Sequence, residues 1–412
     1  MAFINFLWKL INNQRTQGTA IKFFKKQKTL FWFENQNKQV LSNKTSNEKL
    51  YQVALTLLPN VGSVLAKNLV AYCGSPEAIF KTSKGKLEKI PGIGKEKAEG
   101  ISGADVLKEA EEELKFTEKY NITPLFFTDE NYPQRLKTCT DSPVLLYYKG
   151  NADLNAEKII GIVGTRRATE YGKDVTKKLV ADLAAQNVLV VSGLAYGIDV
   201  AAHNASLENN LKTVGVLAHG LNTIYPQQHK SVAKKMVEQG GLLTEYISTN
   251  EMHPSNFPSR NRIVAGMCDA TVVIESAIEG GAVITANIAN SYNRDVFAFP
   301  GKSTDRFSAG CNFLIKTFKA KMIEGADDLL AEMNWKATAA EQKSKKQQRQ
   351  LALVLSDEEQ KIYNLLNEKT ELAIDSLVDE TQMSSSILAA TLLEMEMNSI
   401  IVSLPGKRYK LI

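Results

Sequence analysis

The segment that decides the fold is Lys158-Ile-Ile-Gly-Ile-Val-Gly-Thr-Arg-Arg167. Its apolar run predicts a buried β-strand, which stops at Gly164 in a polar loop with two arginines, and a helix is expected from about Tyr171. A parallel strand followed by a glycine turn and a helix brings backbone N–H groups and the positive end of a helix dipole to one point, where a phosphate can bind. Arg166 and Arg167 add charge that does not titrate.

The same strand, loop and helix unit recurs between residues 157 and 330. Apolar strands that alternate with helices predict a mostly parallel sheet with helices on both faces, that is, a doubly wound, Rossmann-like α/β fold. The predicted strands are 159–163, 188–191, 214–217, 242–244, 270–274 and 296–299, and helices are expected to begin near Tyr171, Ile198, Gln227, Phe257, Ala282 and Cys311.

Polar, glycine-rich loops follow four of these strands, at residues 164–167, 192–197, 218–220 and 275–281. In doubly wound folds the carboxyl ends of the strands share one edge, so we expect these loops to form one binding site there. Residues 256–262 lead into a helix at the same edge and carry Arg260 and Arg262. Two positions apart on a helix, these arginines would point apart, so both can face one ligand only in a loop or a first turn.

The flanking regions predict two further domains. Residues 46–121 are helical, with two turns at 58–62 and 90–94 that resemble the helix-hairpin-helix module, whose N–H groups contact phosphates. An ordinary helical domain fits equally, and the first turn lacks the second glycine and the basic residue that follows it. Strands at 122–127 and 144–148 are expected to extend the sheet, so the central domain spans 122–333. Residues 334–352 form a lysine-rich linker.

Residues 353–412 predict three helices and a hairpin, which is a winged helix. Its would-be recognition helix, 384–396, is acidic and contains no Lys or Arg, so contact with protein, or packing, is favoured over contact with DNA.

Charge and cysteine usage limit the function classes. The net charge is +5, but the first 50 residues contribute +7, so the remainder carries −2 and needs a local basic patch to bind nucleic acid. Four scattered cysteines argue against a zinc site or disulfides and predict a cytoplasmic protein. No apolar run is long enough to span a bilayer. Residues 1–45 are expected to be a poorly ordered extension, with a basic-aromatic arm for nucleic acid or membrane as the alternative.

No catalytic residue, metal site or cofactor is predicted. The sequence lacks H-E-x-x-H, G-x-S-x-G, the P-loop and a full G-x-G-x-x-G motif. His203 follows Asp199 by four residues, so the two could pair, or Asp199 could instead fix the start of its helix. What remains is an edge of N–H groups and arginines, which suits binding phosphates along a strand.

Several short segments occur in a specific order: Ile162-Val-Gly-Thr-Arg166, Thr169-x-Tyr-Gly172, Ser192-Gly-Leu-Ala-Tyr-Gly-Ile-Asp199, Ala202-His203, Ile224-Tyr-Pro226, Phe257-Pro-x-Arg-Asn-Arg-Ile263, Gly281-x-x-Ile-Thr-Ala286, Val296-Phe-Ala-Phe-Pro-Gly301 and Gly310-Cys-Asn312. This pattern closely resembles the DNA-processing protein A family (DprA, also called Smf), and the resemblance covers about residues 50–412. It implies an extended Rossmann fold between a sterile-alpha-motif-like (SAM-like) helical domain and a winged helix. It also implies a homodimer that binds and protects incoming single-stranded DNA and loads the RecA recombinase in natural transformation, with no established catalytic step.

The resemblance also implies the residues that bind DNA. Arg166 would be the main phosphate contact, and Gln227 stands where many relatives have a lysine, with Lys230 three residues later. The full predicted set is Gly164, Thr165, Arg166, Arg167, Ser192, Gly193, Lys230, Arg260, Asn261 and Arg262, of which Arg167 could instead face solvent.

Other interpretations stay open. A looser resemblance to nucleotide-processing Rossmann enzymes places Glu275, Gly280, Gly281 and Thr285 at their loop, which makes such an enzyme the alternative function. A third possibility is an adaptor that acts through the winged helix without DNA. The segment Gly310–Lys319 predicts a self-association or recombinase-facing surface, or else a core helix packed on the sheet. Its members are Cys311, Phe313, Leu314, Ile315 and Phe318.

Overall fold

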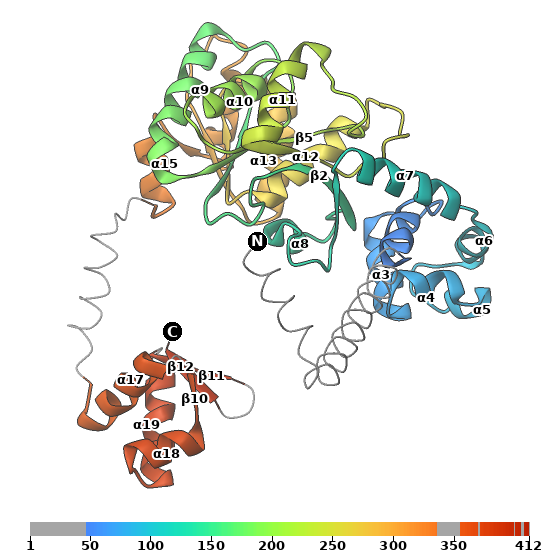
Figure 1. Ribbon diagram of the computed structural model, residues 1–412. Helices are drawn as coiled ribbons and strands as arrows, with labels where there is room; N and C mark the ends of the chain where they lie inside the picture. The colour runs from blue at the N-terminus through green and yellow to red at the C-terminus, as the bar shows by residue number, and fades with distance from the viewer. Residues whose placement is uncertain (1–46, 336–354, 370, 399, 405–407, 412) are drawn as a thin grey trace, which may run out of the picture. The chain divides into compact units, whose positions relative to one another are not determined.

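The computed structural model describes residues 47–335, 355–369, 371–398, 400–404 and 408–411, which belong to two compact units divided between Met333 and Asn334 (Figure 1). The predictions for residues 1–45 and for most of the linker at 334–352 lie outside these residues. Among the described helices, none is long and apolar enough to cross a membrane.

The first unit is built on one nine-stranded sheet with the order β1-β2-β6-β5-β4-β3-β7-β8-β9. Strands β3 to β9 run parallel to one another, whereas β1 and β2 pair antiparallel at the β6 edge. The sequence predicted that these two strands extend the sheet. The strands are β1 (Thr123–Phe126), β2 (Leu145–Gly150), β3 (Ile159–Val163), β4 (Leu189–Ser192), β5 (Thr213–Val216), β6 (Gly240–Thr244), β7 (Ala270–Val273), β8 (Asp295–Ala298) and β9 (Lys321–Met322). Only the short β9 was not predicted.

Helices cover both faces of this sheet, which confirms the doubly wound Rossmann-like fold (Figure 1). The helices α9, α10 and α11 pack side by side as one layer, and α12 packs on α13 in the other. Apolar side chains fill the space between helices and strands, and every residue of β3 is buried. The helices are α8 (Gln134–Lys137), α9 (Glu170–Leu183), α10 (Ile198–Glu208), α11 (Lys230–Gln239), α12 (Asn256–Met267), α13 (Gly281–Ser291), α14 (Ala309–Lys316) and α15 (Ala326–Glu332).

The helical domain packs against the β1–β2 edge of the sheet. A single apolar cluster joins Leu55 and Leu69 of this domain to Phe126 and Tyr147 of the two strands. Each predicted hairpin ends at a helix start, since Gly62 and Gly94 are the N-cap residues of α3 and α6. The domain comprises a helical stretch at 47–56, then α3 (Ser63–Cys73), α4 (Pro76–Lys81), α5 (Lys84–Leu87), α6 (Lys95–Gly103) and α7 (Leu107–Lys119).

The second unit has the predicted winged-helix architecture. Its helices pack around a core of its own that includes Ile362, Leu377 and Leu388. The elements are α17 (Asp357–Lys369), β10 (Glu371–Ala373), α18 (Ile374–Thr381), α19 (Ser385–Met397), β11 (Ile401–Leu404) and β12 (Arg408–Leu411). Strand β10, which the sequence analysis missed, pairs with β12 of the hairpin.

A buried carboxylate also links the helical domain to the sheet. Glu113 of α7 accepts hydrogen bonds from the Ser248 N–H at 2.9 Å and from the Ser248 hydroxyl at 2.5 Å. Burial raises the pKa of Glu113, and the bonds from Ser248 oppose that rise. A carboxyl with a raised folded-state pKa holds its proton more tightly in the folded protein. The stabilisation that comes from this tighter proton binding is therefore fully present below the unfolded-state pKa of about 4.3. It is lost as the pH rises through the folded-state pKa of Glu113.

Glu113→Gln is expected to stabilise the protein more at about pH 7 than at about pH 4, because it removes this ionisation and keeps an oxygen acceptor for Ser248. Thermal unfolding followed by circular dichroism checks the difference in Tm between variant and parent at each pH. Glu118→Gln, at an exposed position of α7, is the matched control. A Tm difference that is the same at both pH values would contradict the assignment.

Candidate nucleic-acid interface

A cleft of about 630 Å³ lies at the carboxyl ends of β3, β4 and β7. This is where the strand order reverses, because β4 to β6 lie on one side of β3 and β7 to β9 on the other. Doubly wound folds bind their ligands at this switch point. We call it the switch-point cleft, and its lining includes Gly164, Thr165, Arg166, Ala195, Asp199, Phe257, Arg260, Asn261, Ser276, Ala277, Gly280, Gly281 and Thr285.

Arg166 lies at the mouth of the cleft on the loop after β3. Its side chain is exposed, and its Cζ atom lies 5.2 Å from the centroid of the Phe257 ring, a cation–π contact. The loop is fixed from both sides, since the Thr165 N–H donates to the Glu275 carbonyl at 2.7 Å and the Ile198 N–H donates to the Thr165 carbonyl at 3.3 Å. The mouth therefore presents a positive charge beside an aromatic face.

Arg260 supplies a second guanidinium at the floor of the cleft. It is 5% exposed, its Nη1 donates to the Val216 carbonyl, and its Nε has no hydrogen-bond partner among the described residues. A Cβ at Gly193 would lie 2.0 Å from Arg260 Nη1, so only glycine leaves room for this guanidinium. Burial lowers the pKa of Arg260 and the charge of Asp199 opposes that change, yet an arginine stays charged in proteins.

Asp199 fixes the loop after β4. Its carboxylate accepts from the N–H groups of Gly193 at 3.1 Å and Ala195 at 3.4 Å, as a residue at the start of α10 can do. The alternative pairing with His203 is wrong, because His203 Nδ1 contacts the Thr213 hydroxyl at 2.7 Å. Burial lowers the pKa of His203 to about 3, so its ring is neutral.

Glu275 has a structural role that sequence reasoning missed. Its carboxylate accepts from the Thr169 N–H at 2.9 Å and from the Thr169 hydroxyl at 2.5 Å, and Thr169 is the N-cap of α9. A Cβ at Gly172 would lie 2.3 Å from the Glu275 carboxylate. In the sequence, the motif Thr169-x-Tyr-Gly172 was the signal that could have pointed to this contact. Glu275 therefore joins the first and fourth loops and is not among the residues that line the cleft.

Helix α13 directs its N-terminus at the cleft. It starts after Gly280, whose backbone is extended and gives no side-chain cap, and Gly281 and Ala282 both line the cavity. The N–H groups of a first helical turn have no partner within the helix, so they can donate to an anion.

Five predicted DNA-binding residues lie outside the lining of the cleft. Gly193 lines only the small cavity that adjoins it. The Ser192 hydroxyl is buried and donates to the Ile162 carbonyl at 2.6 Å. Arg167 and Lys230 are exposed, Lys230 at the start of α11. Arg262 points away from the cleft because residues 256–267 form a helix. On a helix, residues two positions apart point in different directions, so Arg260 and Arg262 cannot face the same ligand.

Phe257 and two tyrosines were not among the predicted site residues. A small cavity that adjoins the cleft is lined by Arg166, Gly193, Tyr196, Tyr225, Phe257 and Arg260. The rings of Tyr225 and Phe257 meet edge to face, with centroids 6.0 Å apart. The segments Ile224-Tyr-Pro226 and Phe257-Pro-x-Arg carried the signal, but only the fold brings them together.

For most of α14 the structure supports the alternative of a core helix packed on the sheet. Cys311 and Leu314 are fully buried and belong to the core that packs on the sheet, and Phe313 and Ile315 are partly buried. Phe318 is 96% exposed in the turn after α14. Phe318 is the most exposed residue of the predicted set, and for this residue the partner surface stays a prediction.

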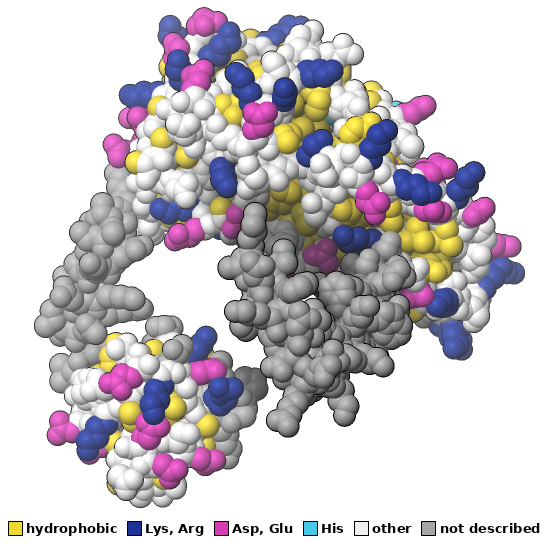
Figure 2. Space-filling view, in the orientation of Figure 1, with side chains coloured by type: hydrophobic (Ala, Val, Ile, Leu, Met, Phe, Trp, Pro, Cys, Tyr) yellow, Lys and Arg dark blue, Asp and Glu magenta, His cyan; other side chains and the backbone are white. Residues whose placement is uncertain are grey.

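Charged side chains are mixed over the visible face of each unit, with Lys and Arg interspersed among Asp and Glu (Figure 2). The positive charge of the cleft is therefore a local feature, in agreement with the −2 balance of the chain beyond its first 50 residues.

Known proteins share this fold and these motifs. Residues 123–334 match the family model of DNA recombination-mediator protein A, residues 344–407 the DprA winged helix domain, and residues 53–102 a SAM-like helix-hairpin-helix tandem. Protein Smf of Synechocystis sp. is 31% identical over 399 residues, which cover 89% of this chain and 99% of that protein. The DNA processing protein DprA of Streptococcus pneumoniae is 39% identical over 207 residues, or 50% of this chain and 73% of that protein.

The X-ray structure of DNA processing protein A from Streptococcus pneumoniae matches with a TM-score of 0.58 at 30% identity, over 69% of this chain and 97% of that one. The family model covers just over half of the chain, and a full-length relative exceeds 30% identity. The chain therefore belongs to the DNA recombination-mediator protein A family, whose members are also called DprA or Smf.

Proposed function

We propose that this chain is a recombination mediator that binds single-stranded DNA in the switch-point cleft. The observation that carries the proposal is the pairing of Arg166 with the Phe257 ring at the mouth of the cleft, above the buried guanidinium of Arg260. Single-strand binding needs charge for the backbone and an aromatic face for an unpaired base. The cleft offers both within one cavity.

Single strands are favoured over duplex by the aromatic component. A base inside a duplex is already stacked on its neighbours, whereas an unpaired base gains about 1–3 kcal/mol from stacking on a protein aromatic ring. The N-terminus of α13 and the loop of Gly164 and Thr165 add N–H donors, which contact phosphates regardless of sequence.

The enzymatic alternative depends on a carboxylate that is free to act on a nucleotide. Glu275, its main candidate, is occupied by Thr169, and Asp199 is occupied by the N–H groups of Gly193 and Ala195. The two functions differ in a simple assay. An enzyme should turn over free nucleotides, whereas a binder should show affinity that grows with oligonucleotide length and falls steeply with salt.

Family membership supports three further parts of the proposal. The protein would act in the cytoplasm as a homodimer, protect incoming single-stranded DNA, and load a RecA recombinase on it during natural transformation. The winged helix would serve protein contacts, since residues 353–412 carry five Lys and Arg against ten Asp and Glu. An acidic domain is repelled by a phosphate backbone.

Arg166→Ala is expected to weaken single-strand binding strongly and to reduce the slope of log K against log salt by about 0.7, the value for one lost phosphate contact on a single strand. Filter-binding titrations over a salt series check both quantities. Lys178→Ala removes one exposed charge from α9, outside the cleft, and is the matched control. Unchanged affinity for Arg166→Ala would contradict the proposal.

Removal of residues 351–412 is expected to leave single-strand affinity largely intact, because the cleft lies entirely in the first unit. A gel-shift comparison of truncated and full-length protein, with single- and double-stranded oligonucleotides at two salt concentrations, checks this. A large loss of affinity on truncation would show that the winged helix takes part in binding.

Phe318→Glu is expected to convert dimers to monomers, because an exposed phenylalanine beside the edge strand β9 is a suitable self-association contact. Multi-angle light scattering measures the mass, and circular dichroism shows that the fold is retained. Thr304→Glu places the same charge at another exposed position as the control. Dimers that persist in the Phe318→Glu variant would exclude this surface as the dimer contact.

A further inference from the structure

We infer that Arg262 is a positioning residue, which holds α12 so that Arg260 and Phe257 face the cleft, and that it does not contact DNA. The inference rests on the DNA-binding function proposed for the cleft. It assigns a role to a residue that the sequence placed among the DNA contacts and that the structure places elsewhere.

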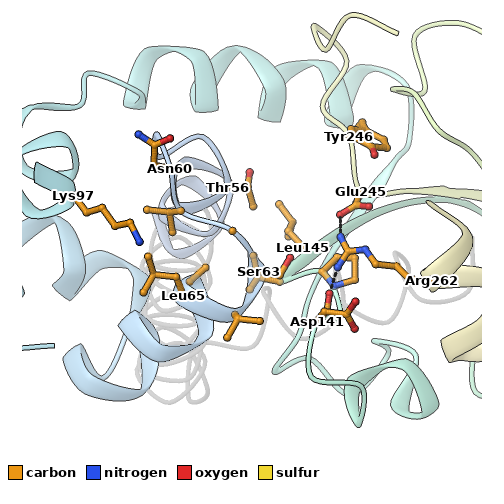
Figure 3. Close-up of a pocket in the computed structure, with 16 residues that line it drawn as sticks. Thr56, Asn60, Ser63, Leu65, Lys97, Asp141, Leu145, Glu245, Tyr246 and Arg262 are labelled. Atoms are coloured by element: carbon orange, nitrogen blue, oxygen red, sulfur yellow. Dashed lines mark hydrogen bonds and ion pairs between the residues drawn. The ribbon is translucent and has the colours of Figure 1, made fainter. Parts of the chain in front are cut away.

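Arg262 is engaged within the protein on all three nitrogens. Its Nη2 forms an ion pair with Glu245, its Nη1 donates to the Asp141 carbonyl, and its Nε donates to the Ser259 carbonyl at 3.2 Å. Figure 3 shows the guanidinium between Asp141 and Glu245, on the wall of a pocket of about 590 Å³. Its side chain is only 17% exposed. An arginine committed in this way has little left to offer a phosphate.

Arg260 and Arg262 act on opposite sides of the same helix. Residues two apart on a helix point in nearly opposite directions, so Arg260 reaches the floor of the cleft while Arg262 reaches the loop before β2 and the end of β6. The rotation of α12 about its axis therefore sets both contacts at once. A helix freed on the Arg262 side can move Phe257 and Arg260 relative to Arg166.

The buried carboxylate of Glu245 would lose its ion-pair partner if Arg262 were removed. Burial raises the pKa of Glu245 and the charge of Arg262 opposes that rise, while the second carboxylate oxygen of Glu245 has no hydrogen-bond partner among the described residues. Without Arg262, a largely buried carboxylate would have to take up a proton or move towards water. The loss of the ion pair itself removes this contact between α12 and the end of β6.

The helical domain also contacts the loop before β2, at residues 139–142. Lys67 of α3 donates to the carbonyls of Cys139 at 3.4 Å and Thr140 at 3.2 Å, and to the Ser142 hydroxyl at 2.6 Å. Residues 139–142 thus receive Lys67 from one domain and Arg262 from the other.

The sheet domain holds this loop at a further point. The Tyr292 hydroxyl at the end of α13 donates to Asp141 Oδ1 at 2.5 Å. Direct contacts therefore lead from α3 through the loop to α12 and the cleft. In this arrangement the helical domain influences DNA binding by stabilising the cleft, without contacting DNA.

Salt dependence separates a positioning residue from a phosphate contact. We expect Arg262→Ala to weaken binding of a labelled oligothymidylate at least about fivefold, the lower end of typical coupling between sites, with an unchanged slope of log K against log salt. Fluorescence anisotropy over a salt series measures both. Arg166→Ala, measured in parallel, should reduce the slope by about 0.7. Lys67→Ala should give a smaller loss of affinity, also with an unchanged slope.

Arg262→Lys is a second test of the positioning role, and it replaces the alanine variant if that variant does not fold. Lysine can replace an arginine as a point charge on a phosphate, but not as a fork between Glu245 and Asp141. The inference therefore predicts that lysine does not restore affinity. Leu329→Ala, a core truncation in α15 away from these contacts, is the control for lost stability and should keep its affinity once folding is verified by thermal melts.

Three results would overturn the inference: unchanged affinity for Arg262→Ala, a reduced slope for that variant, or full rescue by lysine. If Arg166→Ala also binds normally, the proposed cleft itself is wrong. If only Arg166→Ala weakens binding, the cleft stands and the role given to Arg262 fails.

Discussion

The buried guanidinium of Arg260 imposes requirements on three segments of the chain. A charge taken out of water needs nearby opposite charge and hydrogen bonds, or the fold loses several kcal/mol. Here α12 delivers the side chain, β5 supplies the Val216 carbonyl, and Asp199 of α10 supplies the negative charge. Gly193 leaves the space that the guanidinium occupies. These three contributions fix the guanidinium at the floor of the cleft, where its Nε has no hydrogen-bond partner among the described residues.

The acidic side chains near the cleft are occupied in holding its walls. Glu275 fixes the N-cap of α9, Asp199 fixes the loop after β4, and Glu245 retains Arg262 on the far side of α12. Arg166 is left exposed against an aromatic ring. This division makes the site basic although the chain beyond residue 50 carries a slight excess of acid. Under the proposed function, it would also let a Rossmann-like sheet bind phosphates without the usual dinucleotide motif.

Much of this arrangement was predictable from the sequence. The apolar runs identified β3 to β8, and the glycine loops identified the edge at which Arg166, Arg260 and Asn261 meet. Such predictions succeed because strand burial and turn chemistry are local properties.

Side-chain direction was harder to predict. Whether Arg262 joins Arg260 depends on where α12 begins, and with a start at Asn256 both residues are helical. Cys311 and Leu314 show the same difficulty, because apolar spacing alone does not say which side of a helix meets the sheet. The partnership of Phe257 with Arg166, and the role of Glu275 at Thr169, depend on contacts between distant segments that no local pattern records.

The position of the strand itself remains the decisive observable. Photocrosslinking with 5-iodouracil-substituted single-stranded DNA, followed by mass spectrometry of the adducts, maps where an unpaired base lies on the folded protein. Stacking at the mouth of the cleft predicts adducts on Phe257 or on the neighbouring Tyr225 and Tyr196, and their loss with Arg166→Ala. Adducts confined to the helical domain or the winged helix would contradict the assignment of the switch-point cleft to single-stranded DNA.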